Sequence, residues 1–278
     1  MNSQDLFKDT NIGFIGGGVM ANAILKGISS AELCKLSSVY MSHPHLNENC
    51  KNLQINETTS NELVAEKCNL LILCVKPQVV ESVIDKLQNS LDANRHFIIS
   101  ICAGISLKRL NEMLNKNSKT FRIARCTLNT AARISETCSV FSHTSNLRES
   151  DVNQLNKILS SIGNCFGVVD DSLMDAATSV LASGIAYMYM MADAMADGGV
   201  KMGLTKQMAL KMSVHTMLGA AKLMASEPNT HPSTLKDNVC SPGGTTIHGI
   251  HELERNGFKN SVMCAVEAAV KRAQQFNS

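Results

Sequence analysis

Short apolar runs alternate with helix-like segments over the first 169 residues. The run NLLILCV at 69–75 is continuously apolar, which is typical of a parallel strand buried on both faces. Expected strands cover 11–16, 37–41, 69–75, 96–101, 138–142 and 165–169. Helical periodicity follows the first of them and returns at 79–87, 106–114 and 149–163. This alternation predicts a mainly parallel sheet with right-handed crossovers, covered by helices.

From Asp170 onward the pattern is helical, and no convincing strand follows. Expected helical segments cover about 171–203, 205–226, 246–256 and 260–276, and Gly184 is a candidate break in the first. Residues 173–195 are apolar almost all round, so that helix must be buried. A helical segment of this size can hardly hide it alone, and we expect a partner subunit to cover it. A methionine-rich cofactor site is the alternative, although methionine more often fills gaps in a core.

Composition indicates a globular protein with an aliphatic core. Of 278 residues, 44% are apolar, 18% are charged and 4% are aromatic. The net charge of +2, without a dense basic run, argues against a nucleic-acid or membrane surface. The 10 cysteines form no CxxC pair, and several lie in or beside apolar runs, so we expect free thiols in a reducing compartment. The N-terminus resembles neither a signal peptide nor a transit peptide, and no apolar run could span a bilayer, which predicts a soluble, cytoplasmic protein.

The segment GFIGGGVMA (13–21) reads as strand, glycine turn and helix. Gly16, Gly18 and Ala21 fit the pattern G-x-G-x-x-G/A, at the first strand of an alternating region, where dinucleotide-binding turns occur. Gly16 would permit the tight turn, Gly18 would let a pyrophosphate approach the backbone, and Ala21 would let the helix pack against the strand. The helix start would add N–H donors for the phosphates. An ordinary tight turn is the alternative.

The end of the second strand bears on the choice of dinucleotide. NAD-binding proteins usually carry an acid there for the ribose hydroxyls, whereas this chain has Ser42 and His43. No carboxylate would repel a 2′-phosphate, so we expect NADPH as the cofactor, and NADH remains possible. No arginine stands there to clamp the phosphate either.

Two other turns should border the same cleft, because ligands bind beyond the carboxyl ends of parallel strands. They are VKPQ (75–78) and CAG (102–104), each directly after a buried strand. For Lys76 the alternative is an ordinary solvated lysine. For Cys102 we expect a buried neutral thiol rather than a nucleophile.

The loop SPGGTT (241–246) opens a predicted helix with bare backbone and hydroxyls. The first N–H groups of a helix have no internal partner, and Gly243 and Gly244 leave them uncovered. With the hydroxyls of Thr245 and Thr246, such a loop suits a carboxylate or a phosphate. A plain helix cap preceded by glycine is the alternative that the loop alone leaves open.

Two histidines on the following helix raise the question of a metal. His248 and His251 stand beside Glu252 in the sequence HGIHE, which is neither HExxH nor its inverse. We therefore expect no metal and a solvated helix face.

The segment 235–258 (LKDNVCSPGGTTIHGIHELERNGF) resembles the signature of pyrroline-5-carboxylate reductases. Shorter matches extend the resemblance over nearly the whole chain. They are IGFIGGGVMANAI (12–24), VKPQ (75–78), SICAGIS (100–106), LNTA (128–131), SGIAY (183–187), DGGVKMGL (197–204) and LGAAK (218–222).

This resemblance implies an α/β fold with two domains. A Rossmann-type, doubly wound, mainly parallel sheet over residues 1–169 would bind the dinucleotide, and an all-helical domain over 170–278 would dimerise and bind substrate. The implied reaction is hydride transfer from NADPH, or NADH, to the imine carbon of 1-pyrroline-5-carboxylate. It gives L-proline, the last step of proline biosynthesis. The family forms homodimers that often assemble into decamers.

The resemblance also implies roles for particular residues. The loop would hold the substrate carboxylate, and Thr246 would hydrogen-bond the ring nitrogen as the catalytic residue, with the loop and the nicotinamide in different subunits. Expected substrate contacts are Ser241, Gly243, Gly244, Thr245 and Thr246. Expected cofactor contacts are Gly16, Gly18, Val19, Met20, Ser42, Asn61, Val75, Lys76, Pro77, Cys102, Ala103 and Gly104.

Two motifs depart from the family pattern. RCTLNTA (125–131) has Leu128 and Ala131 where the family commonly has prolines, so we expect a less rigid turn. ASGIAY (182–187) has Ile185 in place of proline, which predicts a weaker helix kink there.

Two other function classes stay open on the residues alone. A 3-hydroxyacid-type dehydrogenase of similar architecture would need a catalytic lysine on the long helix. Lys201 is a candidate, but it lies near the helix end and lacks the expected surrounding motif. A non-catalytic, dinucleotide-sensing dimer is the other alternative.

Overall fold

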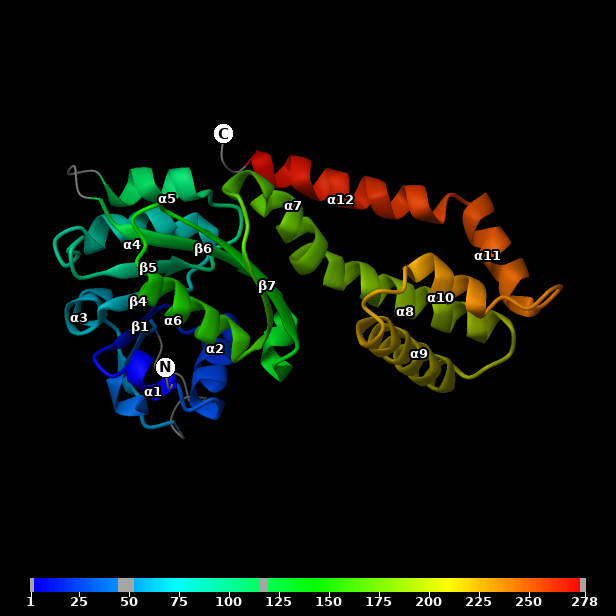
Figure 1. Cartoon of the computed structure of the whole chain (residues 1–278), viewed down its shortest axis with the longest axis horizontal. Coiled ribbons are helices and arrows are strands. Elements are labelled where there is room, and N and C mark those ends of the chain that lie inside the picture. Colours follow the sequence, from blue (N-terminus) through cyan, green and yellow to red (C-terminus); the bar gives the residue numbers. More distant parts are fainter. Residues whose placement is uncertain (1–2, 45–52, 116–119, 276–278) are drawn as a thin grey trace. The chain divides into compact units, whose positions relative to one another are not determined.

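The computed structural model describes residues 3–44, 53–115 and 120–275 (Figure 1). The chain forms two compact units. One consists of Met1–Ala182 with Ala269–Ser278, and the other of Ser183–Ala268.

The first unit is built on an eight-stranded sheet of order β3-β2-β1-β4-β5-β6-β7-β8. The strands are β1 (Ile12–Ile15), β2 (Val39–Ser42), β3 (Asn56–Thr58), β4 (Leu70–Leu73), β5 (Phe97–Ser100), β6 (Arg122–Leu128), β7 (Thr137–His143) and β8 (Gly163–Val168). Every pairing from β3 to β6 is parallel, β7 runs antiparallel to β6, and β8 is parallel to β7. The order of the parallel part is that of the doubly wound dinucleotide-binding fold, which confirms the predicted fold class.

Helices cover both faces of this sheet (Figure 1). On one face, α2 (Val19–Ser30) and α6 (Glu149–Ser160) share a core with Phe14 and Ile72, and the short α1 (Ser3–Leu6) lies at its margin. On the other, Leu71 and Ile98 pack with three helices, α3 (Asn61–Lys67), α4 (Val80–Leu87) and α5 (Leu107–Leu114). All positions of β1, β4 and β5 are buried, as their continuous apolar runs predict.

Strand β6 corrects the interpretation of 125–131 as a turn. Residues Arg122–Leu128 form a strand between β5 and β7, and the turn begins only at Asn129. The sequence hides this strand because Arg122 and Arg125 interrupt its apolar pattern. Both arginines are buried, and each is paired with aspartate. The three-residue edge strand β3 was also absent from the predicted strands.

The long helical stretch after the sheet changes its helix type near the candidate break. A 3-10 turn at Asp171–Leu173 leads into α7 (Met174–Thr178), and a π-helical segment, Ser179–Ser183, separates α7 from α8 (Gly184–Lys201). The irregularity next to Gly184 therefore comes from a π segment rather than from a proline.

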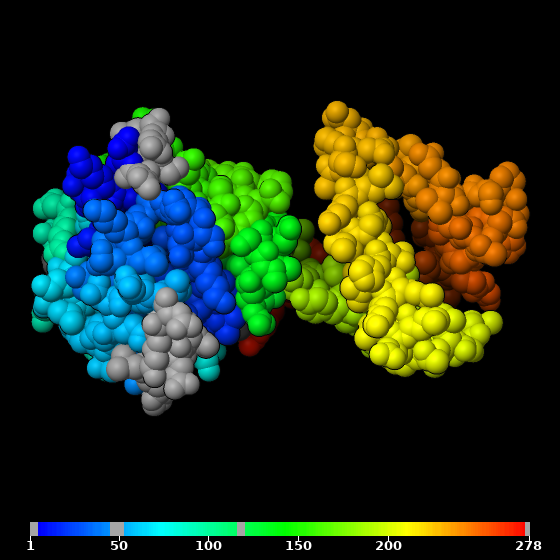
Figure 2. Space-filling model, turned by 90° about the horizontal axis from the view of Figure 1, so that it is seen from below, coloured from blue at the N-terminus to red at the C-terminus, as the bar shows by residue number. Residues whose placement is uncertain are grey.

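The second unit is entirely helical over its described residues. After α8 come α9 (Lys206–Ser226), α10 (Pro232–Asn238), α11 (Thr245–Arg255) and α12 (Phe258–Gln274), whose last residues belong to the first unit. Lys206 joins α8 to α9 by ion pairs with Asp193 at 2.9 Å and Asp197 at 2.5 Å. Figure 2 shows a hollow between the helices of this unit.

Large apolar side chains lie exposed on α8 and α9. Met190 is 73% exposed and Tyr189 is 64% exposed, and Met208 and Met212 are also open. A single chain thus leaves part of 173–195 uncovered, as expected for a surface that a second subunit covers. Among the described residues, no helix combines the length and the apolar character needed to cross a bilayer.

Candidate functional site

The carboxyl ends of the parallel strands meet at one edge of the sheet. Ile15 pairs with Ser42 on one side and with Leu73 on the other, and Leu73 pairs with Ser100. The residues that follow these four therefore lie side by side. The strand order reverses between β1 and β4, the point at which open sheets of this kind bind ligands.

Gly16 makes the tight turn after β1. Its φ is +104°, in the region that favours glycine. A Cβ there would lie 2.9 Å from the carbonyl oxygen of Cys74 and 3.0 Å from Cγ1 of Val75. Its N–H donates to the carbonyl of Ser42 at 3.0 Å. The backbone conformation and the close packing both require glycine at this position.

Gly18 is exposed and is the N-cap of α2. A Cβ at Gly18 would have no heavy atom within 4 Å, and no side chain caps the start of α2. Val19 is 61% exposed and Met20 is half-buried, while Ala21 is fully buried against the sheet. The first N–H groups of α2 thus face accessible space, and the helix dipole favours an anion there. This arrangement fits a pyrophosphate.

At the end of β2, the side chain of Ser42 points into the sheet and that of His43 is more accessible. Ser42 is buried, and its hydroxyl donates to the carbonyl of Phe14 at 3.2 Å. The ring of His43 is half-buried and lies against Gly17, with Cδ2 2.9 Å from where a Gly17 Cβ would stand. Asn61, the first residue of α3, is also half-buried. His43 is therefore the more accessible of the two side chains at this strand end.

The turn after β4 presents its lysine to solvent. Lys76 is exposed and precedes a 3-10 turn that starts at Pro77, while Val75 packs beside the glycine turn.

The turn after β5 is tied to β4 by a thiol. Cys102 Sγ donates to the carbonyls of Leu73 at 3.4 Å and Val75 at 3.3 Å. Burial raises the pKa of this thiol to about 11. Cys102 is therefore a neutral, structural thiol, as the sequence predicted. Ala103 is exposed, and Gly104 has φ +75°.

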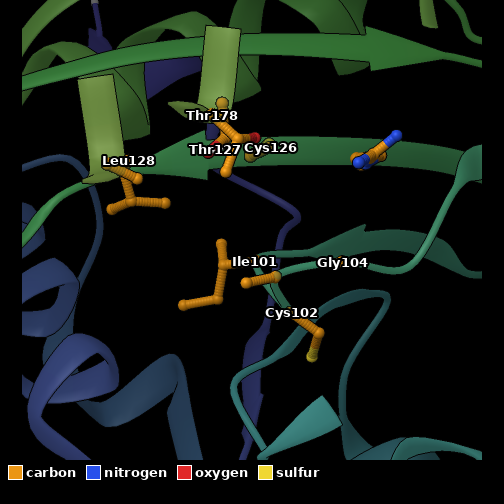
Figure 3. A pocket seen from close by; sticks show the side chains of 10 residues that line it. Ile101, Cys102, Gly104, Cys126, Thr127, Leu128 and Thr178 are labelled. Atoms are coloured by element: carbon orange, nitrogen blue, oxygen red, sulfur yellow. Dashed lines mark hydrogen bonds between the residues drawn. The ribbon is translucent and has the colours of Figure 1, made fainter. Parts of the chain in front are cut away.

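A small cavity of about 40 Å³ lies between the ends of β5 and β6 (Figure 3). It is lined by Ile101, Cys102, Ala103, Gly104, Arg125, Cys126, Thr127, Leu128, Thr178 and Ala182. Thr178 donates to the hydroxyl of Thr127 at 3.0 Å, which closes one wall between α7 and β6. The cavity adjoins the predicted cofactor turn 102–104.

Arg125 organises that wall, a role that sequence reasoning missed. Its guanidinium donates to Asp175 at 2.6 Å and to Asp171 at 3.3 Å, and Ser142 donates to Asp171 at 2.7 Å. Asn129 then caps the 3-10 turn after β6 and donates to the carbonyl of Leu181 at 2.9 Å. The available signal was two aspartates four residues apart, directly after the last strand.

The loop 241–246 forms the uncapped start of α11 in the second unit. Gly243 has φ +65°, and Gly244 is the helix N-cap, with its N–H bonded to the carbonyl of Ser241 at 3.0 Å. Ser241 and Thr245 are exposed and Thr246 is half-buried. Because no side chain caps this 11-residue helix, its first N–H groups and the threonine hydroxyls stand open to a small acid.

The structure thus gathers the predicted cofactor residues at one sheet edge of the first unit and the predicted substrate residues at one helix start of the second. Lys201, the alternative catalytic lysine, is exposed at the last residue of α8. His248 faces the carbonyl of Gly244 through Nδ1 at 2.9 Å. Within the described ranges, no group of three or more His, Cys, Asp or Glu side chains could hold a metal ion.

Comparison with known proteins gives two family matches. Residues 11–104 match the family described as NADP oxidoreductase coenzyme F420-dependent, and residues 171–276 match pyrroline-5-carboxylate reductase dimerisation. Pyrroline-5-carboxylate reductase from Pisum sativum is 39% identical over 268 residues, covering 96% of each chain. Pyrroline-5-carboxylate reductase 2 from Homo sapiens is 35% identical, covering 96% of this chain and 84% of its own.

A solved structure agrees with these relatives. Plasmodium falciparum pyrroline carboxylate reductase, with NADP bound, superposes with a TM-score of 0.86 at 30% identity, covering 97% of this chain and 99% of its own. These relatives are 30% to 39% identical to this chain, and each match covers 96% or more of it. This chain belongs to the pyrroline-5-carboxylate reductase family.

Proposed function

We propose that this protein reduces 1-pyrroline-5-carboxylate to L-proline with NADPH, NADH being a possible substitute. One observation carries the proposal. A single chain holds both an open, glycine-lined helix start suited to a pyrophosphate, at Gly18, and a second, hydroxyl-lined helix start suited to a small carboxylate, at 241–246. The family membership fixes which small acid we propose.

The chemistry requires little more than positioning. A bound nicotinamide dinucleotide supplies the hydride for the imine carbon, which is already electrophilic. The protein must hold the two reactants in contact, and such orientation lowers a barrier by roughly 7–11 kcal/mol at best. Gly16 and Gly18 would seat the pyrophosphate on α2, and the turns 75–77 and 102–104 would border the rest of the dinucleotide.

The substrate would be held by backbone and hydroxyl groups. In our proposal the N–H groups at the start of α11 bind its carboxylate, with contributions from Ser241, Gly243, Gly244 and Thr245. Thr246 hydrogen-bonds the ring nitrogen and orients the imine. A hydroxyl is too weak an acid to protonate the nitrogen alone, so the proton comes from solvent, directly or relayed through Thr246.

The finer assignments belong to the same proposal. We place the domain boundary at 169/170, since β8 ends at Val168 and helices follow from Asp171. We propose a cytoplasmic homodimer, assembled further into a decamer, in which the loop 241–246 of one subunit meets the nicotinamide of another. The exposed methionines of α8 and α9 support a covering subunit. Light scattering tests the assembly.

The activity itself is tested by following NADPH absorbance. We expect oxidation of NADPH on adding pyrroline-5-carboxylate, with proline as the product. Turnover with 3-hydroxyacids and not with the imine would favour the dehydrogenase alternative. Cofactor binding without any turnover would favour a sensing dimer.

A further inference from the structure

A second polar cavity lies at the opposite edge of the sheet from the cofactor turns. Its volume is about 170 Å³, and Leu70, Phe97 and Arg122, which begin β4, β5 and β6, form its floor. The full lining is Thr10, Asn69, Leu70, Arg95, Phe97, Arg122, Arg148, Ser150, Asp151 and Gln154. Since the strands are parallel, this edge lies a full strand length from Gly16 and Cys102.

Arg122 is the buried cation of this cavity. Its side chain is 9% exposed, and its guanidinium donates to Asp151 Oδ1 at 2.6 Å and to the carbonyl of Arg95 at 2.8 Å. Its Nε is buried and has no hydrogen-bond acceptor in the described part of the chain. Nε itself has no surface open to the cavity, so Arg122 contributes to the lining through its paired guanidinium group.

The charges around the cavity do not balance. Three arginines, Arg95, Arg122 and Arg148, face one carboxylate, Asp151. That carboxylate is already engaged on both oxygens, because Oδ2 accepts from the backbone N–H of Arg148 at 2.9 Å while Oδ1 accepts from Arg122. The lining therefore carries a net charge of about +2 and favours an anion.

Three other polar side chains of the lining are already hydrogen-bonded within the protein. Gln154 donates to Thr10 at 2.8 Å, and Asn69 donates to the carbonyl of Asp9 at 3.0 Å. Arg95 donates to the carbonyls of Glu66 and Cys68 through Nη2. The exposed side chains of Arg148 and Ser150 stand at the rim.

The start of α6 adds donors to the same place. Arg148 is the N-cap of this 12-residue helix and forms a capping box with Asp151, while Ser150 lies in the first turn, where backbone N–H groups lack intrahelical partners. Glu149 is acidic, but it does not line the cavity. A helix start with arginines is the recurrent setting for phosphate, because guanidinium groups bind phosphate oxygens bidentately.

The cavity volume of about 170 Å³ is ample for a small oxyanion. We propose that this cavity is a second ligand site that binds a phosphate-type oxyanion, either inorganic phosphate or the phosphoryl group of a small metabolite. It is separate from the dinucleotide site.

Calorimetry with inorganic phosphate tests the proposal on the full-length protein. The titration is made at constant ionic strength, set with chloride, and with saturating NADP⁺, so that phosphate cannot occupy the cofactor turns. We expect saturable binding under these conditions, and the variants described next assign it to this cavity rather than to the loop 241–246. Absence of saturable binding under these conditions, or binding that NADP⁺ abolishes, would overturn the proposal.

Variants locate the site. Arg148→Gln should weaken phosphate binding about tenfold or more, as expected when one charge-assisted contact is lost. Lys157→Gln removes an equal charge from an exposed position on the same helix, outside the cavity, and should leave the affinity unchanged. Equal affinities of Arg148→Gln and the wild type would refute the site.

Two further measurements keep the test sharp. Arg148 lies outside the proposed catalytic groups, so Arg148→Gln should retain its NADPH oxidation rate, which shows that the variant is folded. Glycerol 3-phosphate as a probe separates the two sources of the group. Competition with inorganic phosphate indicates a site for phosphoryl groups generally, and failure to compete indicates a site for free phosphate.

Discussion

The guanidinium of Arg125, on a central strand, donates at 2.6 Å to Asp175, in the first helix after the sheet. Arg125 is 4% exposed, so this pair joins β6 to α7 in a buried setting, and Asp171 makes it a three-residue cluster. The cluster fixes one wall of the cavity beside the cofactor turn 102–104.

Loss of Arg125 should therefore cost stability. Arg125→Gln leaves two partly buried aspartates without their counter-charge, and we expect the free energy of unfolding to fall by roughly 3 kcal/mol. Urea unfolding at one fixed protein concentration measures this, since subunit association contributes to stability. Arg109→Gln is the matched control. Its pairs with Glu81 and Glu112 are exposed and should be worth less than about 1 kcal/mol. Similar losses in both variants would contradict the assignment.

The two glycines of the first turn should separate folding from binding. In Gly18→Ala the new methyl group contacts no neighbour, and the φ of −74° is ordinary, so the free energy of unfolding should change by less than about 1 kcal/mol. NADPH affinity should drop about tenfold, because the methyl group would stand where the pyrophosphate approaches. Gly16→Ala should unfold more easily, by roughly 1–3 kcal/mol, because its φ is positive and its Cβ would press on Cys74. Fluorescence titration and thermal unfolding measure the two effects. Unchanged NADPH affinity in Gly18→Ala would remove this turn from the site.

Thr246 should affect turnover more than folding. Thr246→Ala removes the proposed hydrogen bond to the ring nitrogen, and we expect kcat with pyrroline-5-carboxylate to fall about tenfold or more. Thr246→Ser keeps the hydroxyl and should recover most of the activity. Thr234→Ala, an exposed threonine on α10, serves as the control. If Thr246→Ala turned over as fast as the wild type, the orienting role would be wrong.

Part of the protein's stability should be lost in alkali, because the folded state holds the Cys102 thiol in its protonated form. Its pKa is raised from an ordinary 9.0 to about 11 by burial, so the folded state holds the proton more tightly than the unfolded state. The resulting stabilisation is complete below about pH 9 and is lost as the pH rises towards about pH 11.

The measurement is the difference in unfolding free energy between about pH 8 and about pH 10.5. Cys102→Ala should reduce this difference relative to the wild type, whereas Cys264→Ala, at an exposed position on α12, should leave it unchanged. Activity of Cys102→Ala should persist, because the thiol is structural. A difference that is the same in all three proteins would show that Cys102 does not titrate as its burial requires.

Local patterns in the sequence determined the fold class and the two candidate helix starts. Continuous apolar runs predict buried parallel strands wherever they occur, and the glycines at 16–18 and 243–244 mark turns because few other residues adopt those conformations or leave the backbone open. Each of these signals needs only neighbours in the chain, so each could be interpreted without coordinates.

Tertiary structure decided what lies between distant residues. Strand β6 escaped prediction because Arg122 and Arg125 look exposed in the sequence, and only the packing shows aspartates from α6 and α7 neutralising them. Likewise, nothing local indicates that Ser42 turns its hydroxyl inward to Phe14, leaving His43 as the accessible side chain. Burial and ion pairing depend on contacts between segments that lie far apart in the chain. The pattern of neighbouring residues carries no information about such contacts.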